Sequence, residues 1–138
     1  MPIIRAAEHE PGARFRTLSE PMFMGRGEWG TERYGLGAWR SGLDHCRRRR
    51  RGSLYLYWVG ALRPGRGDGT AGLRWLTEVA DEAGVTLVLH ADPWGTREGM
   101  SRDVLRTWYE RFGFAVKSNR LVPYWPGRLG LTMCRKPG

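Results

Sequence analysis

The sequence predicts a single domain of the α/β class, and three observations support this. The chain has 138 residues, which is the size of one ordinary domain. From residue 53 onward, apolar runs of strand length alternate with amphipathic segments, in the order strand, helix, strand, helix, strand, strand. Twenty glycines and eight prolines mark many turns without forming a low-complexity segment. We therefore expect residues 1–138 to form one domain with a central sheet flanked by helices.

The first fifty residues carry the weakest pattern. In residues 1–30, scattered apolar residues are interrupted by Pro and Gly, which favours short strands and turns. From Thr31, apolar side chains recur at intervals of three and four, which predicts a helix over residues 31–47. This apolar stripe consists of Leu36, Trp39, Leu43 and Cys46. Three glycines weaken the predicted helix by up to about 1 kcal/mol each relative to alanine, and they are Gly35, Gly37 and Gly42.

The middle of the chain has a clearer pattern. Residues 53–62 are aromatic or aliphatic on both faces, which predicts a central strand. A glycine-rich turn follows, and an amphipathic helix with Leu73 and Leu76 on its apolar stripe comes next. Gly84 is a stop signal for this helix, and residues 85–91 predict a second apolar strand.

The last third of the chain predicts one helix and two strands. Ser101 has a side chain suited to cap a helix that leads into Gly113. Residues 114–117 and 129–134 predict two strands, joined by the Pro- and Trp-containing segment 120–128.

The formal charge of +9 makes polyanions natural partners of this protein. Much of the excess lies in the run Arg47–Arg51, with Arg40 shortly before it. A run of this kind forms a solvated helix end or loop, attracts a phosphate-rich cofactor, or binds RNA or another acidic partner. The composition leaves these three interpretations open.

Other features narrow the class of protein. The two cysteines, Cys46 and Cys134, lack the spacing and the neighbouring histidines of a metal site, so we expect no metal and two reduced thiols. No apolar run approaches the roughly 18 to 20 residues that span a bilayer. The first residues lack the apolar block of a secretory signal. We expect a cytoplasmic protein that does not contact a membrane, and we leave a homodimer open.

The turn before the helix at residue 73 has the composition of an anion site. A helix N-terminus offers unpaired backbone N–H groups and a partial positive charge. Gly67, Gly69 and the small Ala71 leave room for a pyrophosphate, and Arg66 adds a full charge. The P-loop and dinucleotide-binding patterns of glycines are both absent from this turn.

Two motifs resemble those of the GNAT N-acetyltransferases. Arg66-Gly67-Asp68-Gly69-Thr70-Ala71 fits the acetyl-CoA-binding pattern Q/R-x-x-G-x-G/A of that family. Further along, the helix that ends Tyr109-Glu110-Arg111-Phe112-Gly113-Phe114 resembles the family's second motif, Y-x-x-x-G-F. The resemblance covers residues 53–118, the expected cofactor-binding core, and implies a mixed central sheet with acetyl-CoA as cosubstrate.

The resemblance also implies roles for individual residues. It places the backbone donor to the thioester carbonyl near residues 61–63, the phosphate clamp at residues 66–71, and Tyr109 as the acid that protonates the leaving thiolate. The implied cofactor-binding residues are Ala61, Leu62, Arg63, Arg66, Gly67, Asp68, Gly69, Thr70 and Ala71. Arg102 stands where the family often has asparagine, which departs from its pattern on the cofactor side.

The expected function is acetyl transfer from acetyl-CoA to a primary amine whose identity the sequence does not reveal. The candidates for a general base are His90, Glu28 and Asp92, and a water relay is the alternative. A second interpretation is a basic RNA-binding module, or a GNAT-like toxin that acetylates aminoacyl-tRNA. Arg47–Arg51 would then bind RNA, with aromatic residues such as Trp94 and Trp125 stacking on bases. A third is a regulator that binds acetyl-CoA without catalysis.

Overall fold

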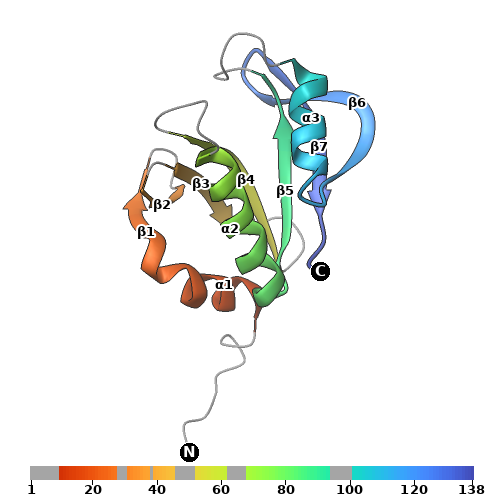
Figure 1. Ribbon diagram of the computed structural model, residues 1–138. Helices are drawn as coiled ribbons and strands as arrows, with labels where there is room; N and C mark the ends of the chain where they lie inside the picture. Colours follow the sequence, from red (N-terminus) through yellow and green to blue (C-terminus); the bar gives the residue numbers. More distant parts are fainter. Residues whose placement is uncertain (1–9, 28–30, 38, 46–51, 62–67, 94–100) are drawn as a thin grey trace, which may run out of the picture.

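The computed structural model describes residues 10–27, 31–37, 39–45, 52–61, 68–93 and 101–138. Three α-helices, a short 3₁₀-helix and seven strands lie within these ranges (Figure 1). In chain order they are α1 (Pro11–Ser19), η2 (Glu20–Met22), β1 (Phe23–Arg26), β2 (Glu32–Leu36), β3 (Trp39–His45), β4 (Ser53–Ala61), α2 (Asp68–Ala83), β5 (Thr86–Ala91), α3 (Arg102–Glu110), β6 (Ala115–Trp125) and β7 (Arg128–Arg135).

The seven strands form one mixed sheet. Their order across the sheet is β1-β2-β3-β4-β5-β7-β6. Strands β4 and β5 are parallel and are connected through α2, whereas every other neighbouring pair is antiparallel. The predicted α/β class, with a mixed central sheet flanked by helices in a single domain, is confirmed.

The parallel strands β4 and β5 pair over only part of their length. Their register covers three residue pairs and ends at Tyr55 and Val88. Two residues further along β4, Tyr57 is an extra residue that forms a bulge against β3. A bulge bends its strand and increases the local twist, so β4 diverges from β5 beyond this point (Figure 1). The bulge lies between the pairs Gly42↔Trp58 and Leu43↔Leu56.

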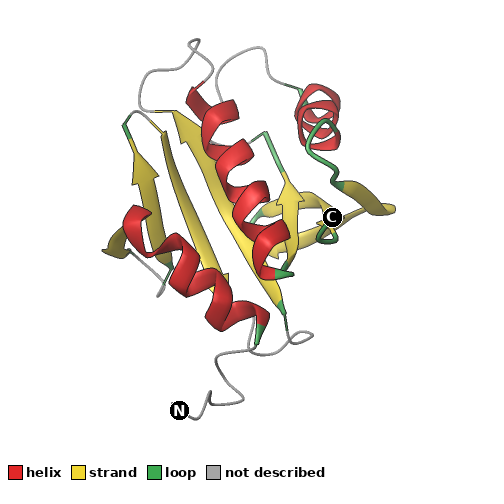
Figure 2. Ribbon diagram, turned by 60° about the horizontal axis from the view of Figure 1, so that its bottom comes forward, coloured by secondary structure: helices red, strands yellow, loops and turns green. Residues whose placement is uncertain are grey.

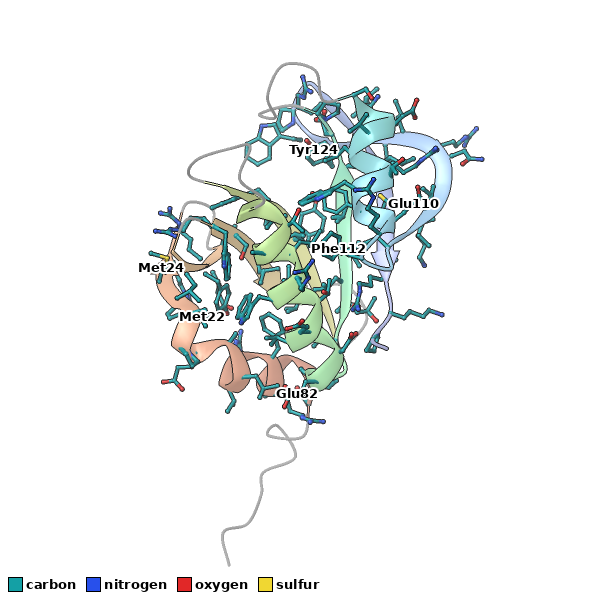
Figure 3. All side chains as sticks on the ribbon, in the orientation of Figure 1. Met22, Met24, Glu82, Glu110, Phe112 and Tyr124 are labelled. Carbon is teal, nitrogen blue, oxygen red and sulfur yellow. The ribbon has the colours of Figure 1, made fainter. Side chains whose placement is uncertain are left out.

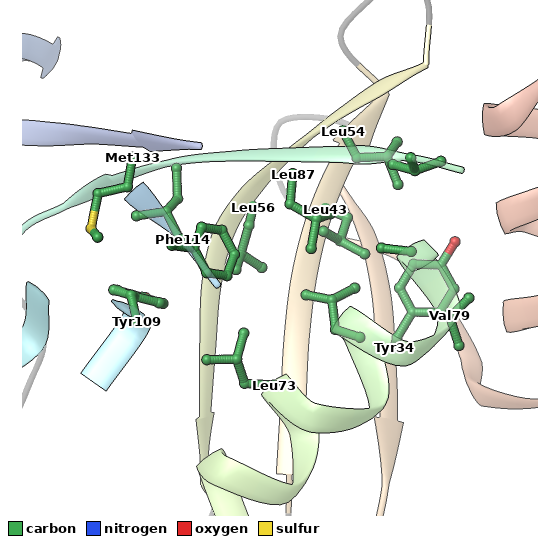
Figure 4. Packing of buried hydrophobic residues seen from close by; sticks show 14 of the residues in the cluster. Tyr34, Leu43, Leu54, Leu56, Leu73, Val79, Leu87, Tyr109, Phe114 and Met133 are labelled. Atoms are coloured by element: carbon green, nitrogen blue, oxygen red, sulfur yellow. The ribbon is translucent and has the colours of Figure 1, made fainter. Parts of the chain in front are cut away.

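One continuous apolar core lies between the helices and one face of the sheet. Figure 2 shows α1 and α2 side by side over this face. The buried hydrophobic residues of α1, α2 and α3 belong to the same cluster as Leu56 of β4 and Leu89 of β5. Figure 4 follows this cluster from Tyr34 at one end to Met133 at the other. Because side chains alternate along a strand, Tyr55 and His90 lie on the opposite face, which we call the helix-free face.

The elements predicted after residue 53 are largely confirmed. Strand β4, helix α2 and strand β5 occupy the predicted segments. Gly84 ends α2 with φ of +74°, a conformation that glycine adopts without strain. Ser101 caps α3 as predicted, because its hydroxyl oxygen accepts a hydrogen bond of 3.1 Å from the backbone N–H of Val104.

The predicted helix over residues 31–47 is wrong, because strands β2 and β3 occupy this segment and pair as a hairpin. Trp39 and Leu43 are four residues apart, a spacing that a helix turn and two strand alternations share. Both side chains point into the core, as does Tyr34 of β2. Gly37 lies between the strands with φ of +60°, which suits a turn and not a helix.

Two further expectations need correction. Residues 11–19, expected as strands and turns, form helix α1 with a proline in its first turn, where a missing N–H costs nothing. Most of the predicted linking segment 120–128 belongs to β6. Pro123 is tolerated there because β6 is an edge strand and needs fewer backbone donors.

Among the helices in the described ranges, none has the length and apolar character needed to cross a membrane.

Candidate active site

The candidate site lies where β4 and β5 separate. The N-terminus of α2 follows β4, and α3 packs beside β5 (Figure 1). Of the cofactor-binding residues predicted from the sequence, the structure describes the backbone of Ala61 and of Asp68, and the whole of Gly69, Thr70 and Ala71. The remaining four lie outside the described residues, and they are Leu62, Arg63, Arg66 and Gly67.

The first turn of α2 has the properties expected of an anion site. The helix begins at Asp68, so the N–H groups of its first residues have no hydrogen-bond partner within the helix. Gly69 has no side chain and is partly exposed, and Ala71 is exposed. Negatively charged groups can therefore approach the positive end of the helix dipole here.

A hydrogen bond connects the two predicted motifs. The indole Nε1 of Trp108 in α3 donates to the hydroxyl oxygen of Thr70 over 3.2 Å. Trp108 also packs on the neighbouring Tyr109, with ring centroids 5.0 Å apart. The first turn of α2 is thus fixed to α3 on the helix-covered face. Sequence reasoning missed Trp108, although a half-buried indole usually needs a hydrogen-bond partner for its N–H.

Strand β4 presents backbone groups to the space beyond its separation from β5. The register of the parallel pair ends at Tyr55, so β5 supplies no partners for the rest of β4. Backbone N–H and C=O groups need partners, which an amide-containing ligand can supply. A β-carbon added to Gly60 would meet no atom within 4 Å, which leaves the backbone open to close approach. Ala61, the last residue of β4, lies at this end of the strand.

Tyr109 is a buried member of the core. Its side chain is 8% exposed and packs edge-on against Phe114, with ring centroids 5.5 Å apart (Figure 4). Burial raises the pKa of the Tyr109 phenol well above its ordinary value of about 10, so the group stays protonated at neutral pH. It can donate a hydrogen bond to an anion that forms beside it.

The structure describes two of the three candidates for a general base, and their surroundings differ. His90 lies at the end of β5 on the helix-free face, with its Nδ1 2.5 Å from the hydroxyl oxygen of Tyr55. Asp92 is an ion-pair residue, because Arg128 donates two hydrogen bonds to its carboxylate, at 2.9 and 2.7 Å. The guanidinium of Arg128 therefore occupies the carboxylate of Asp92. Glu28 lies outside the described residues.

Tyr124 and Arg102 also interact with the carboxylate of Asp92. The hydroxyl of Tyr124 donates to Asp92 over 2.6 Å, and burial and this carboxylate raise the pKa of Tyr124 to about 12. Arg102 lies 3.9 Å from the same carboxylate and donates to the carbonyl of Leu129 over 3.3 Å. The arginine that departs from the family pattern therefore contacts the β6–β7 hairpin. Sequence reasoning did not identify Tyr124 or Arg128, because both lie within the predicted linker 120–128.

Within the described ranges, His, Cys, Asp and Glu side chains form no group of three or more that could hold a metal ion. Cys134 is a free thiol in β7, whereas Cys46 lies outside those ranges. Arg47–Arg51, Trp94 and nearly all of the loop before Ser101 are also outside them.

Comparison with solved structures identifies the fold. The anti-CRISPR protein AcrVA5 matches with a TM-score of 0.54 and 17% identity, over 75% of this chain and 96% of that protein. A GNAT-family acetyltransferase from Streptococcus pneumoniae matches with a TM-score of 0.54 and 19% identity, over 78% of this chain and 66% of that enzyme. GCN5 of Tetrahymena matches with a TM-score of 0.52 and 12% identity, over 98% of this chain and 88% of that protein.

These structures establish that the chain has the GNAT fold, which the sequence motifs predicted. The similarity is one of structure, because the identities lie below 25%. No family model matches the sequence, and no curated protein matches it either. The chain spans just under two thirds of the length of the Streptococcus pneumoniae enzyme.

Proposed function

We propose that this protein is an acetyl-CoA-dependent N-acetyltransferase that acts on a primary amine. The observation that carries the proposal is the separation of β4 from β5 directly beside the N-terminus of α2. At this separation the amide-containing arm of coenzyme A can lie along the edge of β4 beyond its last described pair with β5. The helix N-terminus, with Gly69 in its first turn, provides a site for the phosphates.

The proposed mechanism is direct transfer. The neutral amine attacks the thioester carbonyl, whose oxygen accepts a hydrogen bond from the backbone N–H groups near residues 61–63. The tetrahedral intermediate then expels the thiolate of coenzyme A. Tyr109, protonated at neutral pH, donates a hydrogen bond and then its proton to this sulfur.

The arginine run Arg47–Arg51 adds a second element to the proposal. The net charge of +9 favours binding of anions, and coenzyme A carries several negative charges. We propose that these arginines increase the affinity for the cofactor modestly, chiefly at low salt. RNA is the alternative anionic partner.

Thermal unfolding in the presence of acetyl-CoA, coenzyme A or a mixed-sequence RNA tests the proposal. Acetyl-CoA and coenzyme A should each raise the melting temperature, because a ligand that binds only the folded state stabilises it. CoA release in the presence of amines then distinguishes an enzyme from a regulator that only binds. Stabilisation by RNA alone would contradict the proposal and favour the RNA-binding module.

A further inference from the structure

A row of aromatic rings lies on the helix-free face, at the point where β4 and β5 part. Tyr57 and Tyr55 of β4 meet edge to face with ring centroids 4.7 Å apart. Tyr55 and His90 follow at 5.3 Å, and His90 stacks on Tyr124 of β6 at 5.2 Å with only 13° between the planes. Strands β4, β5 and β6 therefore contribute rings to one continuous row, which crosses β7 between β5 and β6.

The centre of this row is a short hydrogen bond between two strands. Tyr55 is the last residue of β4 that pairs with β5, and His90 lies two residues beyond its partner Val88. The Tyr55 hydroxyl and His90 Nδ1 are 2.5 Å apart. This bond crosses from β4 to β5 where the backbone pairing stops. A thioester inserted between the separating strands would have these two side chains on its helix-free side and Tyr109 on its helix-covered side.

The position of the His90 ring is fixed by its neighbours. Gly130 of β7 lies beneath it, and a β-carbon there would come within 2.7 Å of the His90 β-carbon and 2.9 Å of the Tyr124 ring. Tyr124 is itself held by its hydrogen bond to Asp92. Only a residue without a side chain at position 130 permits this stack. The imidazole is thus preorganised in an orientation that directs Nδ1 at Tyr55.

The charged and titratable groups near the imidazole come from β4, β6, β7, the residue after β5 and helix α3. Among the described residues they include Tyr55 and Tyr57 from β4, Asp92 directly after β5, Tyr124 from β6, Arg128 from β7 and Arg102 from α3. The carboxylate of Asp92 is compensated by Arg128 and Arg102, so the surroundings of the imidazole combine aromatic rings with one cluster of paired charges.

We propose that Tyr55 and His90 form the proton relay that deprotonates the acceptor amine, an inference that rests on the proposed acetyl transfer. As the amine nitrogen bonds to the carbonyl carbon, its proton passes to the hydroxyl oxygen of Tyr55. The original Tyr55 proton passes to Nδ1 of His90, which becomes imidazolium. A second proton passes from the Tyr109 phenol to the thiolate of coenzyme A. The relay therefore takes up one proton on the helix-free face, and Tyr109 delivers another from the helix-covered face. Tyr109 and His90 return to their starting states by proton exchange with solvent.

The relay predicts that the acceptor amine approaches from the helix-free face, across the row of rings. The rings offer apolar and π surface beside one polar pair, which is the composition of a site for a small organic molecule. The acceptor class that fits is a primary amine joined to an aromatic or aliphatic group, rather than a phosphorylated amine.

The test measures CoA release from acetyl-CoA with three amines: tyramine, spermidine and Nα-acetyl-lysine. The variants are Tyr55→Phe and His90→Gln, with Thr17→Val as the control because it removes an exposed hydroxyl of α1 outside the row of rings. The affinity for acetyl-CoA and the thermal unfolding of each variant are measured alongside. We expect Tyr55→Phe and His90→Gln to lower kcat/KM for the amine by about 10²-fold, with cofactor affinity unchanged.

The pH profile distinguishes a relay from a merely structural contact. In the wild type, kcat should fall at low pH, where protonation of the imidazole removes the proton acceptor of the relay, and both relay variants should lose this limb while Thr17→Val keeps it. Full activity in either relay variant, or a lower rate with an unchanged pH limb, would overturn the proposal. So would a wild type that binds acetyl-CoA yet releases no CoA with any of the three amines. A wild type that does not bind acetyl-CoA would instead reject the proposed function itself.

Discussion

The two faces of the sheet at β4 and β5 differ in composition and in what they do. On the helix-covered face, Leu56 and Leu89 belong to the continuous apolar core. On the helix-free face, the neighbouring residues Tyr55 and His90 form a polar contact within a row of rings. Adjacent residues of one strand thus have different roles: one packs in the core, and the next belongs to the proposed proton relay.

The two faces also differ in the interactions that fix the positions of their side chains. Core residues are fixed by volume, because close packing makes any lost methyl group costly. The helix-free residues are fixed by hydrogen bonds and by ring contacts. Met24, near the other edge of the sheet, is 54% exposed and lies far from Tyr124 (Figure 3). The proposed chemistry is confined to the place where the strands separate.

The largest expected effect on stability comes from the helix-covered face. Leu89 is 1% exposed, so Leu89→Ala should lower the free energy of unfolding by about 2 to 5 kcal/mol. Urea unfolding measures this loss. The matched control is Leu129→Ala, because Leu129 is 48% exposed and its truncation should change the stability by less than about 0.5 kcal/mol. Equal losses in the two variants would show that the core is not where we place it.

The second prediction tests whether the hydroxyl of Tyr109 takes part in the reaction or whether Tyr109 serves only in packing. Tyr109→Phe keeps the ring in the core and removes only the hydroxyl, so turnover should fall by about 10²-fold. In the part of the chain that the structure describes, no group hydrogen-bonds this hydroxyl, so the melting temperature should hardly change. The affinity for acetyl-CoA should also be unchanged. Full turnover in this variant would reduce Tyr109 to a packing residue.

A double-mutant cycle tests the link between the two motifs. Trp108→Phe and Thr70→Val each remove the hydrogen bond between α3 and the first turn of α2. A neutral hydrogen bond contributes about 0.5 to 1.5 kcal/mol, so the two changes should be non-additive by roughly 1 kcal/mol in urea unfolding. Strict additivity would mean that the two residues do not interact in solution.

The smallest effect concerns an ion pair far from the site. Arg135 binds Asp81 of α2 through two hydrogen bonds, at 2.7 and 2.8 Å, and these bonds are the main cause that holds the pKa of Asp81 below its usual range. A lowered pKa stabilises the fold above the unfolded pKa of about 3.9, and the contribution disappears as the pH falls through the folded value.

Asp81→Asn should therefore be less stable than the wild type at pH 7, by less than about 1 kcal/mol because the pair is partly exposed. The gap should narrow as the pH falls from 5 toward 3 in urea unfolding. A gap that is constant over this range would mean that the charge of Asp81 contributes nothing.

The sequence predicted the C-terminal two thirds of the fold better than the N-terminal third. Helix α2 and strands β4 and β5 carry long, unbroken patterns, and Ser101 is a strong local capping signal. The β2–β3 hairpin was missed because a spacing of four residues fits both a helix and a strand, and the inward Tyr34 gave no contrary signal. The segment forms strands because β2 also pairs with β1 and β3 also pairs with β4, and such tertiary pairing overrides the local pattern.

The candidate site was predictable in part. The motif residues Gly69 to Ala71 and Tyr109 could be read from local patterns. The Tyr55–His90 pair could not, because 35 positions separate its members and the contact depends on how β4 and β5 pair. The same holds for Trp108 and Thr70, which are 38 positions apart.

Calorimetric titration of acetyl-CoA into three proteins tests the central claim most directly. They are the wild type, Gly69→Glu, and Asn119→Glu, which adds the same single negative charge at an exposed position of β6 outside the site. The account predicts that the wild type and Asn119→Glu bind with equal affinity and that Gly69→Glu does not bind, because a carboxylate would occupy the position of a phosphate at the N-terminus of α2. Unchanged affinity in a folded Gly69→Glu protein would contradict the account.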